Sequence, residues 1–351
     1  MIKSLKLFIF IRKSSSAAKR IFVPMQYRLP AFIIFFFLLP FSGYAQQTDT
    51  VASYNSGTDI LLLPDTIPPP AGNRRLPWVA GISAGAVGGS LLLLNQAWYK
   101  SQSRTSFHFF NDNREWLQVD KWGHTWSAYN AARATSSMWH WAGLSRKKAA
   151  VLGAITSYSY LTGIELLDGF AEKWGWSWGD VAANTTGIGL YLAQELAWQE
   201  QRIQYKFSFH ANRYPNPILS ERANDLFGEN FAEKMLKDYN AQTYWFSANI
   251  HSFFPNSKWP PWLNLAIGYG ASGMYGGFEN RWETASGNLV DRRDIPRVRQ
   301  FYFAPDIDFT RIRTKSRFLK TTFSILNAFK FPAPTFMIDG KGRARVYAVY
   351  F

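Results

Sequence analysis

The 351-residue sequence contains no cysteine. This absence excludes disulfide bonds, thiolate metal sites and cysteine nucleophiles. It also excludes lipid attachment at a mature N-terminal cysteine, so attachment to a membrane would depend on the protein's own apolar surface. Histidine is scarce as well, with five residues. Four of them have no acidic residue at a useful spacing, so nucleophilic catalysis has little support.

The first 45 residues have the three features of a secretory signal. Arg28 provides a basic start, residues 31–39 are wholly apolar, and Gly43 and Ala45 are the small residues that a signal peptidase reads. We expect cleavage after Ala45. Residues 1–24 either extend the basic region or precede a true start at Met25. An uncleaved anchor is the alternative, but the apolar run is shorter than the ~20 residues that span a bilayer.

The charge is concentrated in the C-terminal part of the chain. Removing the seven basic residues of the signal leaves 32 basic and 24 acidic residues, a net charge of +8. Residues 281–351 contain 14 basic and six acidic residues and so account for this excess. Anionic headgroups or lipopolysaccharide phosphates would suit such a surface. A solvated basic face is the alternative, and we expect no nucleic-acid partner for an exported chain.

The remaining sequence divides into three parts. Residues 46–77 are polar and then proline-rich, which predicts an extended tether. Residues 78–201 predict a bundle of about four apolar helices, beginning with an uncharged stretch, Trp78–Trp98, in which glycines recur every fourth position. The other three helices are expected at about 120–141, 146–168 and 180–201. The 15 tryptophans favour a bilayer interface, with a tryptophan-rich soluble core as the alternative.

The pattern changes to period two after residue 201, which indicates antiparallel strands. Strands are expected at 203–209, 244–254, 262–275, 300–309 and 346–351, among about six in total. A polar helical insert is expected at 219–239 and a short amphipathic helix at 316–329. The fold class is therefore α+β, with residues 202–351 forming the strand region. Since membrane barrels begin at eight strands, an open sheet packed on the helices or against a membrane is expected.

The most specific polar motif is Asp120-Lys121-Trp122-Gly123-His124. Residues four apart share one helix face, so Asp120 and His124 could act as an oriented general base or as two metal ligands. The alternative is that Asp120 only caps a helix beginning at Lys121.

Two later motifs repeat this arrangement. Glu165 and Asp168 lie three residues apart near a helix end, where acidic side chains oppose the helix dipole and need a cation, a metal or solvent. Asp180 and Asn184 lie four apart, with Gly187 one turn further on. Asp180 is alternatively a helix cap, whereas a buried Asn184 must find hydrogen-bonding partners.

Together the three motifs predict one converging site in an otherwise apolar bundle. Such a set of ligands would suit an oxygen-preferring divalent metal ion. A purely structural network would use the same residues. The candidate catalytic residues are His124, Asp120 and Glu165. The candidate metal ligands are Asp120, His124, Glu165, Asp168 and Asp180. Lys121, Asn184 and Gly187 are the candidate structural members.

The order of these motifs resembles the YfiM-like envelope proteins, known as domain of unknown function 2279. More distantly it is similar to VanZ-like membrane proteins, which share the Asp-Lys-x-x-His start and the Asp-x-x-x-Asn-x-x-Gly ending. The resemblance covers about residues 78–200. It implies a periplasmic lipoprotein or membrane protein without an assigned reaction, and the missing cysteine departs from the lipoprotein pattern.

Two functions follow as expectations. The first is a non-enzymatic cell-envelope protein, associated with the outer membrane or its periplasmic face, that binds lipid, anionic headgroups or an envelope protein. The second is a metal-dependent hydrolase or transferase that acts on a lipid or phosphate-bearing envelope substrate.

Overall fold

The computed structural model describes residues 75–94, 103–214, 216–284 and 286–351. The predicted signal peptide, with its cleavage at Ala45, and nearly all of the predicted tether lie outside the described residues. The first helix, α2 (Leu76–Leu94), begins two residues before the predicted bundle. Pro77 lies in its first turn, where proline is tolerated because that backbone nitrogen needs no intrahelical acceptor.

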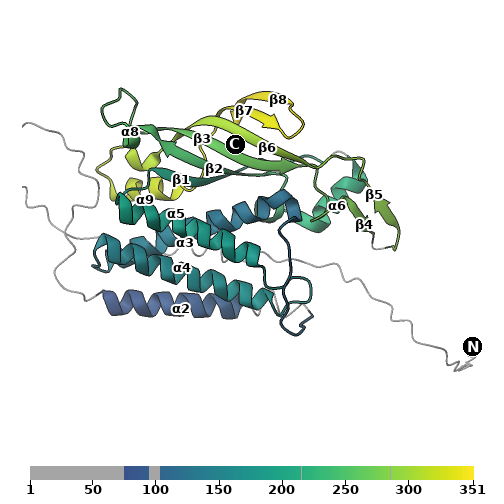
Figure 1. The fold of residues 1–351 in the computed structure, drawn as a ribbon, viewed down its shortest axis with the longest axis horizontal. Helices are drawn as coiled ribbons and strands as arrows, with labels where there is room; N and C mark the ends of the chain where they lie inside the picture. The colour runs from purple at the N-terminus through teal and green to yellow at the C-terminus, as the bar shows by residue number, and fades with distance from the viewer. Residues whose placement is uncertain (1–74, 95–102, 215, 285) are drawn as a thin grey trace, which may run out of the picture.

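The structure is α+β, with a layer of helices on one side of an antiparallel sheet (Figure 1). Helices α3 (Val119–Trp141), α4 (Arg146–Asp168) and α5 (Trp178–Ala197) pack on one another, and α2 lies along α4. A Cβ atom added to Gly153 of α4 would lie 2.5 Å from the backbone nitrogen of Ser136 of α3. Glycine therefore permits these two helices to approach closely.

The predicted bundle of four apolar helices is not confirmed in that form. Helix α3 buries several polar side chains, including Asn130 and Thr135. The Thr135 hydroxyl lies 2.9 Å from the Gly153 carbonyl oxygen and 3.0 Å from the Ser157 hydroxyl on α4. Short side chains with internal hydrogen bonds thus occupy this part of the contact between α3 and α4.

The main sheet has six antiparallel strands in the order β1-β2-β3-β6-β7-β8. Their bounds are β1 (Ile203–Phe209), β2 (Gln242–Asn249), β3 (Leu263–Ser272), β6 (Val298–Ile307), β7 (Ala333–Asp339) and β8 (Ala344–Tyr350). A separate pair is formed by β4 (Arg281–Glu283) and β5 (Leu289–Asp291). The predicted six-stranded antiparallel sheet is thereby confirmed.

Short helices lie before α3 and in the connections between strands. They are η3 (Glu115–Gln118), α6 (Pro217–Phe227), α7 (Phe231–Lys237), α8 (Ile250–Phe253), η4 (Phe309–Arg311) and α9 (Arg317–Leu326). The insert predicted at 219–239 is two helices, because Gly228 and Asn230 separate them. The strand predicted to run from 244 to 254 ends at Asn249, whose side chain accepts a hydrogen bond from the Ser252 backbone and caps α8.

One face of β1, β2 and β3 packs against α3 and α5. Trp122 of α3 stacks on Tyr269 of β3 with ring centroids 4.9 Å apart, and also on Tyr205 of β1. Trp126 packs on Phe207, and its indole nitrogen donates to the Ala328 carbonyl oxygen. These aromatic contacts fix the helices on the sheet and so hold the start of α3 in place.

The opposite face of the sheet curls around an aromatic and polar interior. Tyr350 of β8 reaches across to Thr243 of β2, with their hydroxyl oxygens 3.0 Å apart. Lys206 of β1 and Asp306 of β6 are fully buried, with the Lys206 Nζ 2.7 Å from the Asp306 Oδ2. Lys330 also lies beside Asp306. The interior of the curled sheet therefore contains a fully desolvated ion pair.

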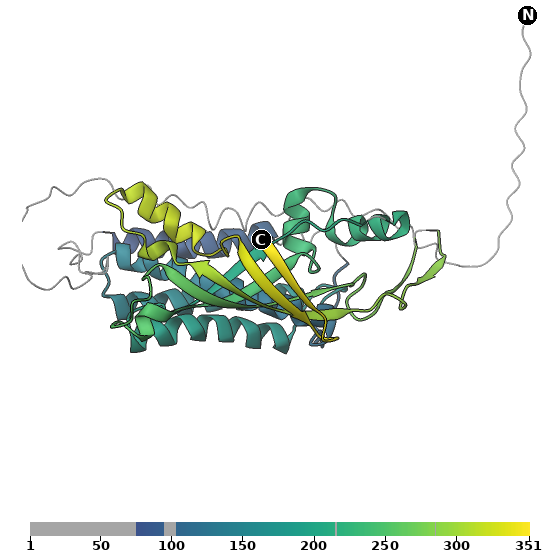
Figure 2. The same ribbon diagram turned by 90° about the horizontal axis from the view of Figure 1, so that it is seen from above.

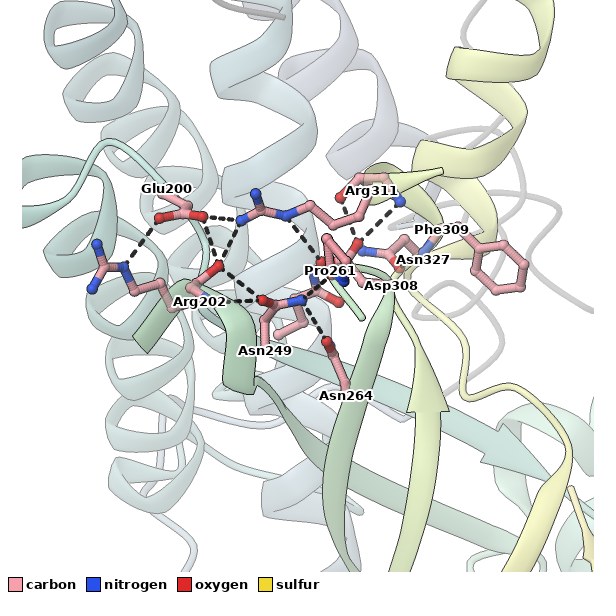
Figure 3. A network of polar contacts seen from close by, with 12 residues as sticks. Glu200, Arg202, Asn249, Pro261, Asn264, Asp308, Phe309, Arg311 and Asn327 are labelled. Atoms are coloured by element: carbon pink, nitrogen blue, oxygen red, sulfur yellow. Dashed lines mark hydrogen bonds and ion pairs between the residues drawn. The ribbon is translucent and has the colours of Figure 1, made fainter. Parts of the chain in front are cut away.

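A second polar network joins the end of α5 to the connection between β6 and α9 (Figure 3). Arg311 donates to Glu200 and, over 2.8 Å, to the hydroxyl of Ser252. Glu200 also accepts from Arg202 at the start of β1. Viewed from above, α9 lies near one end of the curled sheet, and the β4–β5 pair projects at the other end (Figure 2). The network thus anchors the α9 end of the sheet to the helical layer.

Candidate functional site

The structure brings the predicted polar residues of α3, α4 and α5 together in one cluster. Its centre is Lys121, whose Nζ lies 2.6 Å from Asp180 Oδ1, 2.7 Å from Asp112 Oδ2 and 3.0 Å from Asp120 Oδ2. Burial lowers the pKa of Lys121, but the three surrounding carboxylates outweigh this effect and raise the pKa above its ordinary value. Lys121 is therefore a permanent cation that fixes the positions of these carboxylates.

His124 lies beside this ion-pair network, one turn along α3 from Asp120. Its Nε2 is 3.3 Å from Asp180 Oδ1 and 3.8 Å from Asp120 Oδ1, and its Nδ1 is 3.7 Å from Glu165 Oε1. Burial lowers the pKa of His124, but Asp120, Asp180 and Glu165 outweigh it and raise the pKa to about 9. In this arrangement the imidazole is protonated at neutral pH, which makes it a poor general base.

Glu165 is the member of the cluster with the fewest partners. Its side chain is buried, with the residue 1% exposed, and its Oε1 has no hydrogen-bond partner in the described part of the chain. The 3.7 Å separation from His124 is too long for a hydrogen bond. Burial raises the pKa of Glu165 to about 8, while His124 opposes this. A buried carboxyl oxygen without a donor is costly and suggests a ligand at this point.

The two aspartates of the cluster have different environments. Burial raises the pKa of Asp180 to about 6, although His124 and Lys121 act against this. For Asp120 burial also favours the neutral form, but His124 and Lys121 outweigh it, and the pKa is lowered. The hydroxyl of Tyr239 donates to Asp120 Oδ1 over 2.8 Å. Asp120 is therefore a stable carboxylate whose Oδ1 faces His124.

The alternative that these aspartates only cap helices is wrong. Helix α3 begins at Val119 after the cap residue Gln118, so Asp120 is inside the helix. The cap of α5 is Ser177, whose hydroxyl accepts a hydrogen bond from the Asp180 backbone nitrogen over 3.1 Å. Both aspartate side chains are thus available to the cluster.

The other predicted members occupy different positions. Asp168 is the half-buried last residue of α4, outside the group of Asp120, His124 and Asp180 that could share one ion. Asn184 is buried, and its Oδ1 is also without a hydrogen-bond partner among the described residues. A Cβ atom on Gly187 would lie 2.2 Å from the Thr125 carbonyl oxygen, so this glycine is needed where α5 crosses α3.

Two contributors to the cluster were missed by the sequence prediction. Asp112 binds Lys121 and accepts a 2.6 Å hydrogen bond from the Ser177 hydroxyl. Tyr239 comes from the turn after α7, far along the chain from its partner Asp120. Asp112 lies outside the helical periodicity, and nothing in the local sequence pairs Tyr239 with α3. Only tertiary packing brings them in.

The sequence Gly81-Ile82-Ser83-Ala84-Gly85 matches the nucleophile-elbow pattern but not its structure. The pattern requires a sharp turn between a strand and a helix. Here it lies in the middle of α2. Ser83 is therefore not held as an exposed nucleophile.

A different kind of surface lies on the sheet, where β3, β6, β7 and β8 curl beyond the helices. Exposed apolar side chains face each other across neighbouring strands, in the pairs Ile267–Phe303, Phe303–Phe336, Phe336–Val346 and Phe301–Ile338. Their exposed fractions range from 41 to 78%. We call these six residues the apolar band: Ile267, Phe301, Phe303, Phe336, Ile338 and Val346.

Residues 311–320, which we call the basic segment, run from the end of η4 into the first turn of α9. They contain five basic residues and no acidic one. None of the residues of α9 is buried, and Phe318 is 77% exposed. Basic residues also lie at the opposite end of the band, where Lys341 and Arg343 form the turn between β7 and β8. Positive charge thus flanks the apolar band at both ends of its strands.

Within the described residues, α4 is the helix long and apolar enough to cross a membrane. A third of its apolar window is buried in the structure, and core helices of soluble proteins meet the same criterion. The length and composition of α4 are therefore weak indications of a membrane span.

Residues 108–194 match the family model described as "Predicted periplasmic lipoprotein (DUF2279)". This segment is similar to the DUF2279 family. The match confirms the resemblance predicted from the motifs, and it contains the whole cluster except Tyr239. The periplasmic location predicted for that family supports an exported, periplasmic envelope location for this chain. The match gives no support for the similarity to VanZ-like proteins. Comparisons with curated proteins and with solved structures gave no match.

Proposed function

We propose that this protein is a non-enzymatic envelope protein that binds the lipid surface at the periplasmic face of the outer membrane. The observation that carries the proposal is the apolar band. Six large apolar side chains lie opposite one another on four neighbouring strands and remain exposed. A contiguous exposed apolar surface of this kind is typical of an interaction site.

The interior of the same strands favours lipid as the partner. Along β6 the exposed Phe301 and Phe303 alternate with the buried Tyr302 and Ala304, and further along Asp306 faces the interior beside Lys206. This distribution, with apolar side chains outside and polar ones inside, is that of strands in the outer membrane. It supports an outer-membrane surface as the environment of the band.

Charge adds a second contribution to binding. The basic segment and the turn after β7 place positive residues at both ends of the band, and the amphipathic helix α9 presents Phe318 beside them. Amphipathic helices with basic flanks lie in the interface of anionic membranes. Each basic residue near such a surface contributes about 1 kcal/mol.

Vesicle binding tests the proposal. The mature chain should co-sediment with vesicles of phosphatidylethanolamine and phosphatidylglycerol, and more weakly with phosphatidylcholine. Replacing both Arg313 and Lys315 by Ser should reduce affinity for the anionic vesicles about thirty-fold, from about 1 kcal/mol for each charge. Arg281→Ser, on the distant β4 strand, is the control for loss of a positive charge elsewhere on the surface.

The band requires its own variant. Phe303→Ser with Phe336→Ser should weaken binding to both vesicle types, whereas Leu289→Ser, an exposed apolar residue on β5, should not. In cells, the protein should fractionate with the outer membrane and resist extraction by alkaline carbonate. Recovery as a freely soluble periplasmic protein, or equal vesicle binding by the band variant and its control, would overturn the proposal.

The alternative is a metal-dependent hydrolase or transferase. It requires a divalent ion beside His124, because the protonated imidazole is a poor base by itself. The existence of that ion site is a separate question from lipid binding.

A further inference from the structure

We propose that Asp120, His124 and Asp180 form a binding site for one divalent transition-metal ion of the Mn²⁺ or Zn²⁺ class. One imidazole nitrogen and two carboxylate oxygens are ligands that such ions accept. The proposal concerns the helical domain and goes beyond lipid binding by the sheet.

The distances between the ligand atoms suit a single ion. His124 Nε2 lies 3.3 Å from Asp180 Oδ1 and 3.8 Å from Asp120 Oδ1, and the three atoms all lie within 4.8 Å of one another. Ligand atoms about 2.0–2.2 Å from a common ion in tetrahedral geometry are roughly 3.4 Å apart. Small side-chain movements would therefore complete the coordination.

Glu165 provides an independent indication of a ligand. It is 1% exposed, and its Oε1, which has no hydrogen-bond partner in the described structure, lies on the Nδ1 side of His124. Histidines that bind metals commonly donate their other ring nitrogen to a carboxylate, which directs the metal-binding nitrogen at the ion. Glu165 is thus placed as a positioning residue, with His124 Nε2 directed at Asp120 and Asp180.

The surrounding residues hold the two carboxylate ligands. Lys121 binds Asp120 through Oδ2, so Oδ1 is left facing His124, and Tyr239 donates to that same Oδ1. Asp180 Oδ1 accepts from Lys121 and faces His124 Nε2. Lys121 contributes one positive charge against the carboxylates of Asp112, Asp120 and Asp180, and a divalent cation would balance the remaining negative charge.

Metal binding by the tag-free mature chain tests the site directly. After treatment with EDTA and dialysis, Mn²⁺ and Zn²⁺ are titrated separately by isothermal calorimetry, and bound metal is measured by mass spectrometry. We expect one equivalent of ion per chain. His124→Ala should abolish this binding, and Glu165→Gln should weaken it about 10–100-fold. His140→Ala is the matched control, because His140 lies at the other end of α3 and bonds to the Leu144 carbonyl.

Thermal unfolding shows whether the variants are folded and gives a second readout. Saturating ion should raise the Tm of the wild type and of His140→Ala, and leave that of the nearly isosteric Asp180→Asn unchanged. Absence of stoichiometric binding by the folded wild type would overturn the proposal and leave the cluster as a structural network. Unchanged affinity in folded His124→Ala or Asp180→Asn would also overturn it.

Discussion

Asp306→Asn should strongly destabilise the protein, because it breaks the ion pair inside the curled sheet. Lys206 and Asp306 are both fully buried, with 2.7 Å between the Lys206 Nζ and the Asp306 Oδ2, and the second ammonium, of Lys330, lies 3.7 Å from the Asp306 Oδ1. Removing one partner of a buried pair costs about 3–5 kcal/mol, since the other charge stays buried without compensation. In a chain of this size that corresponds to a decrease in Tm of roughly 10 °C.

Asp294→Asn is the matched control for this experiment. Asp294 also pairs with a basic residue, Arg292, with 2.9 Å between Asp294 Oδ1 and Arg292 Nε, but its side chain is 64% exposed. Exposed pairs contribute about 0–1 kcal/mol. Thermal and urea unfolding of both variants would measure the difference. A cost below about 1 kcal/mol for Asp306→Asn would refute the assignment of a desolvated pair that needs its carboxylate.

The loss of stability in Asp306→Asn, relative to the wild type, should also depend on pH, because Lys330 titrates. Burial lowers the pKa of Lys330 to about 8, and Asp306 opposes this, so removing Asp306 should lower the pKa further. A lysine whose pKa is lower in the folded state than in the unfolded state binds fewer protons when folded, and stability then rises with pH between the two values. In Asp306→Asn this rise begins at a lower pH, so the deficit relative to wild type should shrink from pH 7 to pH 9. A deficit constant over this range would contradict the role given to Lys330.

Two further predictions concern α5. Gly187→Ala should cost about 1–3 kcal/mol, because the new Cβ would press on the Thr125 carbonyl. Gly189→Ala, where nothing lies within 4 Å, should be neutral or stabilising by about 1 kcal/mol, and equal Tm values for the two variants would contradict the close crossing of α5 and α3. Ser177→Ala should cost about 1 kcal/mol in urea unfolding through loss of the α5 cap, and an unchanged midpoint would show that the cap contributes little.

The ranges of α3 and α4 and the convergence of the cluster could be predicted from the sequence, for a physical reason. Residues four apart lie on one helix face, so the Asp120–His124 and Asp180–Asn184 spacings restricted the direction of each side chain. Short connections between α3, α4 and α5 then left few ways to bury those faces. The bounds of α4 and β1 agree with the predicted ranges. Residue spacing could not predict the contributions of Asp112 and Tyr239, because they join the cluster only through packing of distant segments.

Other structural features could not be predicted because they depart from the usual local sequence patterns. Strand β7 was not predicted, since Pro334 removes a backbone donor and normally argues against a central strand. It is tolerated because it lies at the bulge between Ala333 and Thr335 in the pairing with β8. Lys206 and Asp306 alternate with apolar residues as exposed side chains would. Period two shows that the faces differ, but not which face is enclosed.

That ambiguity bears on where the protein acts. Hydrophobicity alone predicts that Phe303 of β6 and Phe336 of β7 face the interior, and that Asp306 and Thr335 face water. The structure shows the reverse. In an aqueous compartment this inversion would expose a row of paired aromatic and aliphatic side chains and bury a costly ion pair. Contact of the outer face with lipid would remove the first cost without altering the second. Because the ion pair joins β1 to β6 behind the apolar band, Asp306→Asn should weaken vesicle binding as well as stability.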